Sequence, residues 1–407
     1  MIKNCVVIGA SHAGSQFAFS LRQGGWKGDI TIIGEEFDYP YHRPPLSKTF
    51  LSCEKKIQDI LLRPAELYEK SGINIRLGER VKSIDRSNKS ITTEDNNVIY
   101  YHKLVIATGA RVREIPIPGS EIEGVCYLRN ARDVNNIKSQ VIPGKHAVII
   151  GGGYIGLETA ASLRKQGMEV TVIEAMSRIL QRVTAPELST FYKRIHLEEG
   201  VKIFEETVAT EFKSIDEKIN VLTSCGKSFL GDMVIVGIGV IPNVELANSA
   251  GLKVENGVEV NEFCQTSDSE IYAIGDVSWH YNKLYDRSLR LESVPNATEQ
   301  AKIAALHINK KPKAYNSLPW FWSDQYNLKL QIAGLSNGYN DIVIRGDINK
   351  SRSFSAFYFK DNKLLAVDAV NSPREFMFTK MVLTKEQKLN KEILSDISLD
   401  LKSAIIN

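Results

Sequence analysis

The chain has 407 residues, enough for two or three domains, and its 43% hydrophobic and 24% charged residues are typical of a soluble globular protein. Its 51 Lys and Arg residues and 48 Asp and Glu residues give a net charge of only +3, and without a basic block this argues against nucleic-acid binding. The longest apolar run, residues 233–241, is far shorter than the roughly 20 residues that a membrane helix needs.

The first expected elements are a strand over residues 5–8 and a glycine-cornered turn over residues 9–14 that leads into a helix. Such turns bind the pyrophosphate of a dinucleotide, because the glycines let the backbone bend and approach it and the helix start directs N–H groups at the anion. An acid is expected about twenty residues later to bond the ribose, and Glu35 follows the next expected strand, residues 29–33. Ser11 replaces the middle glycine of the pattern, so a Cβ must be tolerated beside the pyrophosphate.

The same pattern recurs in the middle of the chain. A strand over residues 147–150 runs into Gly-Gly-Gly-Tyr-Ile-Gly at residues 151–156, and Glu174 follows a further strand, residues 169–173. One glycine-rich turn is a weak signal. Two turns that each have an acid in register indicate two bound dinucleotides.

Strands and helices alternate up to about residue 280, which favours parallel sheets with crossover helices. Two similar strand ends, residues 104–109 and 234–239, are each followed by a proline-bearing link that suits a crossing between domains. The second turn lies between these crossings, so one nucleotide-binding domain is expected to be inserted into another. The expected domains are residues 1–112 with 237–317, residues 113–236, and residues 318–407.

Two features follow the second crossing. Residues 266–276 are expected to form a buried strand that ends in Gly-Asp, where Asp276 can accept hydrogen bonds from sugar hydroxyls; an ordinary turn-starting aspartate is the alternative. The segment around Val294 and Pro295 begins a helix expected over residues 296–306, whose positive N-terminal end can stabilise a nearby anion. In the last domain, predicted to be mixed α+β, the expected strands are residues 329–333, 342–345, 354–359 and 364–370, followed by helix.

Together these stretches resemble the flavoprotein NADH-dependent ferredoxin reductases of bacterial oxygenase systems, the group of putidaredoxin, rubredoxin and dioxygenase-ferredoxin reductases. The likeness covers nearly the whole chain, and its most discriminating motifs are Arg-Pro-Pro-Leu-Ser-Lys at residues 43–48 and Trp-Phe-Trp-Ser-Asp-Gln at residues 320–325. The implied fold is α/β, with two Rossmann-like domains, an NAD domain (113–236) inserted into an FAD domain, and a C-terminal α+β domain.

The resemblance also implies cofactor contacts residue by residue. The residues implied for FAD are Gly9, Ser11, His12, Ala13, Gly14, Glu35, Arg43, Lys48, Ala107, Thr108, Gly109, Asp276, Val294, Pro295 and Trp320. The residues implied for NAD are Gly151, Gly153, Tyr154, Ile155, Gly156, Glu158, Glu174 and Gly239. No metal site is expected.

Three of these residues, Lys48, Glu158 and Trp320, are implied to act where the flavin meets the nicotinamide. Lys48 would supply positive charge near the flavin and pair with Glu158; the alternatives are a solvated loop lysine and an ordinary first-turn helix glutamate. Trp320 would lie beside the isoalloxazine ring, while its alternation with Trp322 in a strand-like run favours core packing. We expect both roles for Trp320.

The implied activity is that of a ferredoxin–NAD(+) reductase, in which electrons pass from NADH through FAD to a small 2Fe–2S ferredoxin, or a rubredoxin, that serves a cytochrome P450 or a ring-hydroxylating dioxygenase. The partner is expected to be acidic, and the enzyme a monomer or weak dimer. Candidate docking residues are Arg287, Arg290, Arg374 and Lys380. Because the first expected strand begins almost at Met1, we expect no signal or transit peptide and a cytoplasmic location.

Two other activities stay open at this point. An NADH oxidase or peroxidase shares such a core but carries a redox cysteine near the flavin, whereas residues 41–43 occupy that region here and Cys53 lies beyond Lys48. The five cysteines are widely spaced and include no Cys-x-x-Cys, which argues against a dithiol relay or a cysteine-ligated metal. An NADH-responsive binding protein similar to apoptosis-inducing factor would be expected to carry a targeting segment and a basic surface, and neither is evident in the sequence.

Overall fold

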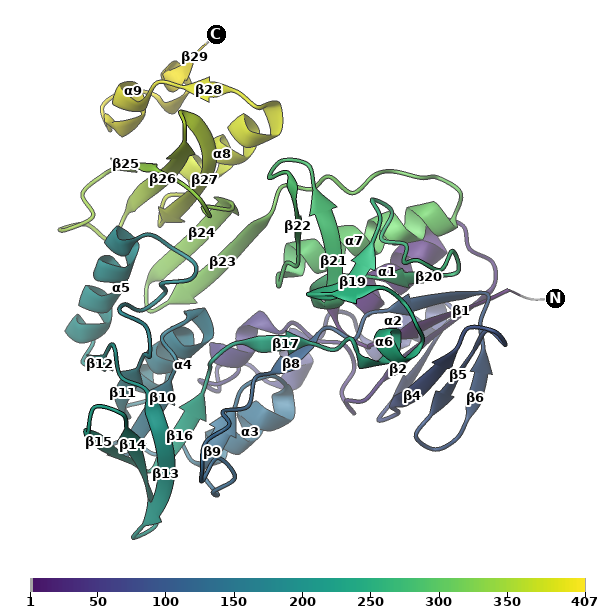
Figure 1. The fold of residues 1–407 in the computed structure, drawn as a ribbon, viewed down its shortest axis with the longest axis horizontal. Helices are drawn as coiled ribbons and strands as arrows, with labels where there is room; N and C mark the ends of the chain where they lie inside the picture. Colours follow the sequence, from purple (N-terminus) through teal and green to yellow (C-terminus); the bar gives the residue numbers. More distant parts are fainter. Residues whose placement is uncertain (1–2, 407) are drawn as a thin grey trace. The chain divides into compact units, whose positions relative to one another are not determined.

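The computed structural model describes residues 3–406, and the chain divides into two compact units (Figure 1). Unit 1 comprises residues 3–42, 57–111 and 241–319, and unit 2 comprises residues 43–56, 112–240 and 320–406. Two of the crossings between the units occur in the short strands β8 (Ala110–Val112) and β17 (Val240–Pro242). Each unit is therefore assembled from three separate segments of the chain.

Unit 1 is built on a five-stranded parallel sheet with the strand order β20-β7-β1-β2-β3. These strands are β1 (Asn4–Ile8), β2 (Asp29–Gly34), β3 (Ile73–Leu77), β7 (Lys103–Ile106) and β20 (Ile271–Ala273). The apolar runs of β1, β2, β7 and β20 are buried on both faces of the sheet, which is why they read as continuous hydrophobic stretches, whereas the edge strand β3 is only partly buried. Successive side chains point to opposite faces, so Val7 joins one core and Val6 the other.

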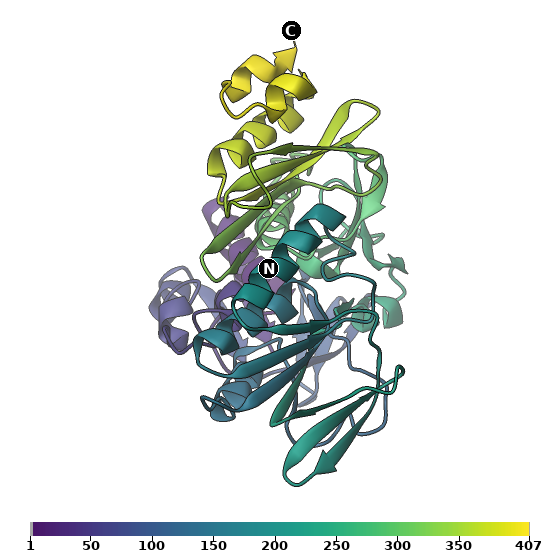
Figure 2. The same cartoon turned by 90° about the vertical axis from the view of Figure 1, so that its left-hand side faces the viewer.

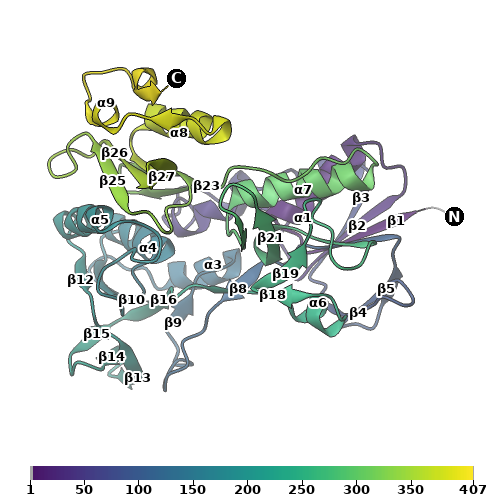
Figure 3. The ribbon, with the colours of Figure 1, turned by 45° about the horizontal axis from the view of Figure 1, so that its top comes forward.

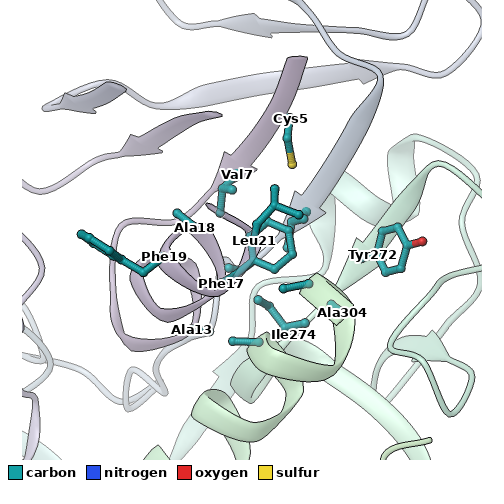
Figure 4. Packing of buried hydrophobic residues seen from close by; sticks show 14 of the residues in the cluster. Cys5, Val7, Ala13, Phe17, Ala18, Phe19, Leu21, Tyr272, Ile274 and Ala304 are labelled. Atoms are coloured by element: carbon teal, nitrogen blue, oxygen red, sulfur yellow. The ribbon is translucent and has the colours of Figure 1, made fainter. Parts of the chain in front are cut away.

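Two helices cover one face of this sheet. The helices α1 (His12–Gln23) and α7 (Val294–Ile308) lie side by side (Figure 3). Figure 4 shows the core beneath them, where Phe17 and Leu21 of α1 lie near Val7 of β1 and Ala304 of α7. This packing fixes the start of α1 against the carboxyl ends of the strands.

Smaller elements complete unit 1. One antiparallel sheet contains β4 (Val81–Asp85), β5 (Ser90–Thr93) and β6 (Val98–Tyr100). A four-stranded sheet contains β18 (Val254–Glu255), β19 (Gly257–Val260), β21 (Ser278–Asn282) and β22 (Arg287–Leu289). The remaining helices are α2 (Ala65–Lys70), α6 (Glu245–Ser249), and the 3₁₀ turns η2 (Ile57–Ile60) and η3 (Gly275–Val277).

Unit 2 contains a second five-stranded parallel sheet, with the strand order β12-β11-β10-β16-β9. These strands are β9 (Val125–Tyr127), β10 (His146–Ile150), β11 (Glu169–Ile173), β12 (Lys202–Phe204) and β16 (Met233–Val236). The helices of this part are α3 (Ala131–Ser139), α4 (Tyr154–Lys165), α5 (Pro186–Glu198) and the 3₁₀ turn η1 (Pro44–Ser47). An antiparallel sheet of β13 (Ala209–Ile215), β14 (Lys218–Thr223) and β15 (Ser228–Gly231) follows β12.

The C-terminal part of unit 2 is an antiparallel sheet with the order β23-β24-β27-β26-β25, against which the helix α8 packs through β24 and β27 (Figure 2). The strands are β23 (Trp320–Gln325), β24 (Leu328–Gly334), β25 (Asp341–Arg345), β26 (Phe354–Lys360) and β27 (Lys363–Val370). The remaining elements are α8 (Pro373–Lys385), β28 (Lys388–Leu389), α9 (Lys391–Ser395), η4 (Leu401–Ala404) and β29 (Ile405–Ile406).

This architecture confirms the predicted fold class, with two parallel nucleotide-type sheets and a C-terminal α+β part. Both boundaries of one expected helix were wrong by two residues: α7 ends at Ile308 rather than residue 306, and it begins at Val294 rather than residue 296, because Ser293 is the N-cap and its hydroxyl accepts from the Asn296 N–H. Residues 43–56 belong by their contacts to unit 2, which the sequence did not indicate. None of the helices between residues 3 and 406 has the length and apolar character that crossing a bilayer requires.

Candidate active site

The first glycine turn brings β1 and α1 into close contact. Gly9 has φ 119°, and a Cβ there would lie 2.2 Å from the carbonyl oxygen of Ala107. A Cβ on Gly14 would lie 2.0 Å from the carbonyl oxygen of Gly9, so both positions exclude a side chain. Ser11, the N-cap residue of α1, has φ −131° and ψ −156°, an extended conformation that any residue adopts. This explains why the middle position of the turn does not require a glycine.

The second turn repeats this geometry. Gly151 has φ 109°, with a Cβ position 2.4 Å from the carbonyl oxygen of Gly237, and a Cβ on Gly156 would lie 2.1 Å from the carbonyl oxygen of Gly151. Gly153 is the N-cap residue of α4, and among the described residues a Cβ there would meet no atom within 4 Å. The turn therefore leaves space beside its middle glycine, at the start of a helix, as a bound pyrophosphate requires.

The two ribose acids have different surroundings. Glu35 directly follows β2, its side chain is 67% exposed, and its Oε2 lies 3.8 Å from Arg80 Nε. Glu174 follows β11 and accepts hydrogen bonds from the backbone N–H groups of Gly152 (2.7 Å) and Met176 (2.8 Å). Its carboxylate is thus fixed against the second turn.

The other residues that the sequence implied for FAD in unit 1 lie at the same sheet edge, because β1, β7 and β20 are parallel neighbours. Thr108 exchanges two hydrogen bonds of 2.8 Å with Asn243, which ties the end of β7 to the return of the chain into unit 1. Asp276 lies in η3 directly after β20, and a Cβ on neighbouring Gly275 would lie 3.1 Å from the Cβ of Ala13. Unit 1 therefore brings together the glycine turn, residues 107–109 and Asp276.

In unit 2, Lys48 and Glu158 form a largely buried ion pair. Lys48 Nζ lies 2.6 Å from Glu158 Oε2, and the two side chains are 17% and 2% exposed. The same oxygen accepts from the Ser47 hydroxyl at 2.5 Å, while Oε1 accepts from the Ser323 hydroxyl at 2.6 Å. Lys48 is therefore not a solvated loop lysine, and Glu158 is not an ordinary surface glutamate. The expected pair is present, and its contact with cofactors stays a prediction.

The proline-containing loop and the helix α4 fix the positions of these side chains. Pro44 and Pro45 start η1, and the N–H of Lys48 donates to the Pro45 carbonyl at 3.0 Å, which fixes the loop rigidly. Glu158 lies one helical turn after Tyr154 on α4, so both side chains project from similar positions on the helix. The Ser162 hydroxyl donates to the Ser47 carbonyl at 2.6 Å and attaches the loop to α4.

The aromatic residues of unit 2 are packed against one another. The Trp320 ring lies 5.5 Å from Trp322 and 5.8 Å from Phe376, and Lys380 Nζ lies 4.9 Å from the Trp320 ring centroid. This confirms the packing half of the dual role expected for Trp320, while its flavin contact stays a prediction. Burial raises the pKa of Tyr154, so the phenol is neutral.

The remaining residues that the sequence implied are placed as follows. Arg43 donates from Nη1 to the Arg129 carbonyl at 2.8 Å, Ile155 is exposed at the start of α4, and Gly239 has φ 106° with Arg182 close by. The His12 ring lies 5.6 Å from that of His42 in an edge-on contact. Val294 and Pro295 form the first turn of α7.

Sequence reasoning missed the polar partners of Glu158. Ser47 and Ser323 belong to the two most discriminating motifs of the sequence. The period-two alternation of β23 places Ser323 and Gln325 on one face, so the sequence could have predicted that these two side chains are neighbours. His196 of α5, which contacts Gln325 at 2.8 Å, had no signal in the sequence, because the contact spans 129 positions.

The described residues give little support to a metal site or a reactive thiol. Between residues 3 and 406, no group of three or more His, Cys, Asp or Glu side chains is arranged to hold a metal ion. All five cysteines are free, with Cys5, Cys126 and Cys264 buried and Cys53 and Cys225 exposed. Burial raises the pKa of the Cys5 and Cys264 thiols, which makes them unreactive.

The family profile described as pyridine nucleotide-disulphide oxidoreductase matches residues 3–301, and the profile described as reductase C-terminal matches residues 320–405. The chain belongs to the pyridine nucleotide-disulphide oxidoreductase family. As a member of this family it is an oxidoreductase that uses FAD and NAD(H), and its two glycine turns fit two dinucleotides. Individual cofactor contacts stay predictions.

Within this family, the chain is 42% identical to putidaredoxin reductase of Pseudomonas putida over 409 residues, covering 99% of this chain and 96% of that protein. It is 41% identical to rhodocoxin reductase of Rhodococcus erythropolis, covering 98% of this chain and 94% of that one. Among solved structures, the reductase in the covalent putidaredoxin reductase–putidaredoxin complex matches with a TM-score of 0.96 and 40% identity, over 99% of this chain and 98% of that one.

Proposed function

We propose that this protein is an NADH-dependent flavoprotein reductase that passes electrons through FAD to a small 2Fe–2S ferredoxin or a rubredoxin, which in turn serves a cytochrome P450 or a ring-hydroxylating dioxygenase. The observation that carries the proposal is the 42% identity to putidaredoxin reductase across 99% of the chain. The same likeness includes residues 320–405, the part that matches the reductase C-terminal profile.

The residues have the following roles in this proposal. Residues 1–112 and 237–317 bind FAD, residues 113–236 bind NADH, and residues 318–407 form the C-terminal domain. The bound flavin supplies the chemistry that converts a two-electron hydride into single electrons. The turn at Gly9 and the start of α1 bind one pyrophosphate, and Glu35 and Asp276 accept from hydroxyl groups. Lys48 supplies positive charge, and Glu158 fixes its ammonium group through the 2.6 Å ion pair.

An acidic partner, a monomeric or weakly dimeric state and a cytoplasmic location are parts of the proposal that rest on the sequence. Of the candidate docking residues, Arg290 is unsuitable, because its side chain is only 10% exposed and pairs with Glu292 at 2.6 Å. Arg374 is 80% exposed and lies 3.7 Å from Asp400. It is the better choice for a docking test.

The deciding experiment is stopped-flow reduction of the flavin by NADH, followed by reoxidation with a panel of ferredoxins and rubredoxins across a salt series. We expect fast reoxidation by at least one iron–sulfur protein. Its bimolecular rate should fall steeply with ionic strength, whereas flavin reduction by NADH should not. Arg374→Ala should lower the low-salt reoxidation rate about threefold, because one steering charge is lost. Rapid oxygen consumption without reoxidation by any iron–sulfur protein would favour an NADH oxidase instead.

A further inference from the structure

A row of buried polar side chains leads from Glu158 into the interior of unit 2. Ser323 Oγ lies 2.6 Å from Glu158 Oε1, and Gln325 Nε2 lies 3.2 Å from Ser323 Oγ. Gln325 Oε1 lies 2.8 Å from Nε2 of His196, whose Nδ1 lies 3.0 Å from the Tyr326 hydroxyl. Ser323 and His196 are fully buried, and Gln325 is 2% exposed. Ser323, Gln325, His196 and Tyr326 are called the polar row below.

The chemistry of these groups gives the polar row a single direction. A carboxylate only accepts, so Ser323 donates its hydroxyl hydrogen to Glu158. The Ser323 oxygen is then free to accept from the Gln325 amide, and the Gln325 carbonyl oxygen accepts from the Nε2–H of His196. Burial lowers the pKa of His196 to about 4, so its ring is neutral and Nδ1 accepts from the Tyr326 hydroxyl. Every donor in the row therefore points toward Glu158.

This direction matters because the two oxygens of Glu158 have different partners. Oε2 accepts from Ser47 and pairs with Lys48, while Oε1 accepts from Ser323. A carboxylate held at both oxygens cannot rotate without breaking one set of bonds, and in a buried site each broken bond is costly. The bond from Ser323 thus sets the direction in which Glu158 meets Lys48.

We propose that His196 and Gln325 are positioning residues that hold Ser323 in its donating orientation and thereby aim the Lys48–Glu158 pair. The inference rests on the proposed function, in which that pair acts where NADH meets FAD. It extends the site to three elements of unit 2, because Glu158 lies on α4, His196 on α5, and Ser323 and Gln325 on β23.

Four variants separate positioning from simple packing. Gln325→Glu keeps the shape of the side chain, but a carboxylate cannot donate to Ser323 and instead draws its hydroxyl away from Glu158. His196→Phe removes the donor at the far end, and His196→Gln restores an N–H group there. Ser355→Ala is the matched control, since Ser355 is fully buried in β26 of the same sheet and its hydroxyl has no hydrogen-bond partner among the described residues.

The first measurement is the limiting rate of flavin reduction by NADH in single-turnover stopped flow, together with the Kd for NADH and the Tm. We expect Gln325→Glu and His196→Phe to lower the limiting rate about tenfold with little change in Kd, the effect of losing about one hydrogen bond to a charged group. His196→Gln should recover most of the rate, and Ser355→Ala should match the parent. Rates within twofold of the parent in Gln325→Glu, or an equal loss in Ser355→Ala, would overturn the proposal.

The second measurement is the ¹⁵N NMR spectrum of histidine-labelled protein, which needs no turnover. We expect His196 to be the Nε2–H tautomer at pH 7, and its ring nitrogen shifts to move in Glu158→Gln, because an amide at position 158 can donate and reverse the row. An Nδ1–H tautomer in the parent would overturn the assigned direction. Neither measurement uses an iron–sulfur acceptor, so a parent enzyme that fails to reduce ferredoxins would overturn the proposed function while both tests of the polar row still apply.

Discussion

At the carboxyl end of β11, Glu174 is held by the backbone N–H groups of Gly152 and Met176 and cannot swing away from the second turn. Arg178 and Arg182, which follow Glu174, differ in their availability to offset its charge. The Arg178 guanidinium donates hydrogen bonds to the Ser189 hydroxyl at 2.5 Å and to the Gln181 carbonyl at 3.3 Å, whereas Arg182 is exposed. If the coenzyme ribose binds at Glu174 as predicted, a phosphate on that ribose would meet a fixed negative charge.

We accordingly expect a strong preference for NADH over NADPH. A carboxylate about 4 Å from a 2′-phosphate is repelled by about 4 kcal/mol per unit charge at an effective dielectric constant of about 20, which corresponds to several hundred-fold or more in kcat/KM. Glu174→Ala should raise kcat/KM for NADPH and narrow this ratio, while alanine at the nearby exposed Glu206 should leave it unchanged. Comparable kcat/KM values for both coenzymes in the parent would show this role of Glu174 to be wrong.

The turn between β10 and α4 contains one glycine that excludes a side chain and one that leaves space for it. A Cβ at Gly156 would clash with the carbonyl oxygen of Gly151 at 2.1 Å, whereas a Cβ at Gly153 meets no described atom within 4 Å. Gly156→Ala should therefore push α4 away from β10, lower the Tm by several degrees and weaken NADH binding at least tenfold. Gly153→Ser, which copies Ser11 of the first turn, should leave the Tm unchanged.

Calorimetry measures the Tm of the Gly156→Ala and Gly153→Ser variants, and titration with NADH measures their affinity. The Gly153→Ser titration shows in addition whether the second turn accepts a Cβ beside the pyrophosphate as the first turn does. A Gly156→Ala variant with the Tm and NADH affinity of the parent would contradict the close packing of α4 on β10.

The elements of both glycine turns were predictable from the sequence because each is defined locally, by a buried apolar run, a glycine with positive φ and an acid in register. Four of the five strands of the C-terminal sheet, β24 to β27, were predicted to within one residue because each is a short local run of strand-forming residues: β26 (Phe354–Lys360) was expected over residues 354–359. The start of α7 was missed because Ser293 acts as the N-cap four residues before the first strong helix former, Ala297, with Pro295 already inside the helix.

Across the whole molecule, the acid sensitivity of the two units should differ. In unit 1, burial lowers the pKa of His280 from about 6.5 to about 4. The unfolded chain takes up this proton near pH 6.5 and the folded protein only near pH 4, so stability is full above pH 6.5 and is lost as the pH falls toward 4. In unit 2, the lowered pKa of His196 also makes stability fall as the pH falls. Burial raises the pKa of Asp368 to about 6, so the folded protein binds a proton at Asp368 more tightly than the unfolded chain does. Between pH 6 and 4 this proton stabilises the folded state and opposes the effect of His196.

We therefore expect His280→Gln to remove part of the acid sensitivity of the protein. Between pH 7 and 4.5 the parent should lose about 2 kcal/mol more unfolding free energy than the variant, the linkage expected for a depression of about 2.5 in the pKa. Urea unfolding followed by fluorescence at both pH values measures the difference. An equal loss in the two proteins would mean that His280 does not contribute to acid sensitivity.

The features that escaped the sequence are those that depend on distant contacts. Residues 43–56 pack with unit 2 although the segments of the chain on both sides of them belong to unit 1. The polar row likewise joins residues 158, 196 and 323, which no local pattern relates. The sequence already suggested the Lys48–Glu158 pair, and only the fold shows the Ser323 hydroxyl that connects Glu158 to the C-terminal sheet.

The division of each unit among three segments has a consequence for biosynthesis. The sheet of unit 1 lacks its edge strand β20 until residue 273 has left the ribosome, and unit 2 is incomplete until the segment that begins at Trp320 follows. The face of the unit 1 sheet that α7 covers also stays incompletely buried until residue 308 has been synthesised, which makes chaperone binding and slow folding expected. A premature stop before Trp320 would remove more than a terminal appendage, because Ser323 and the sheet that carries it are parts of unit 2 itself.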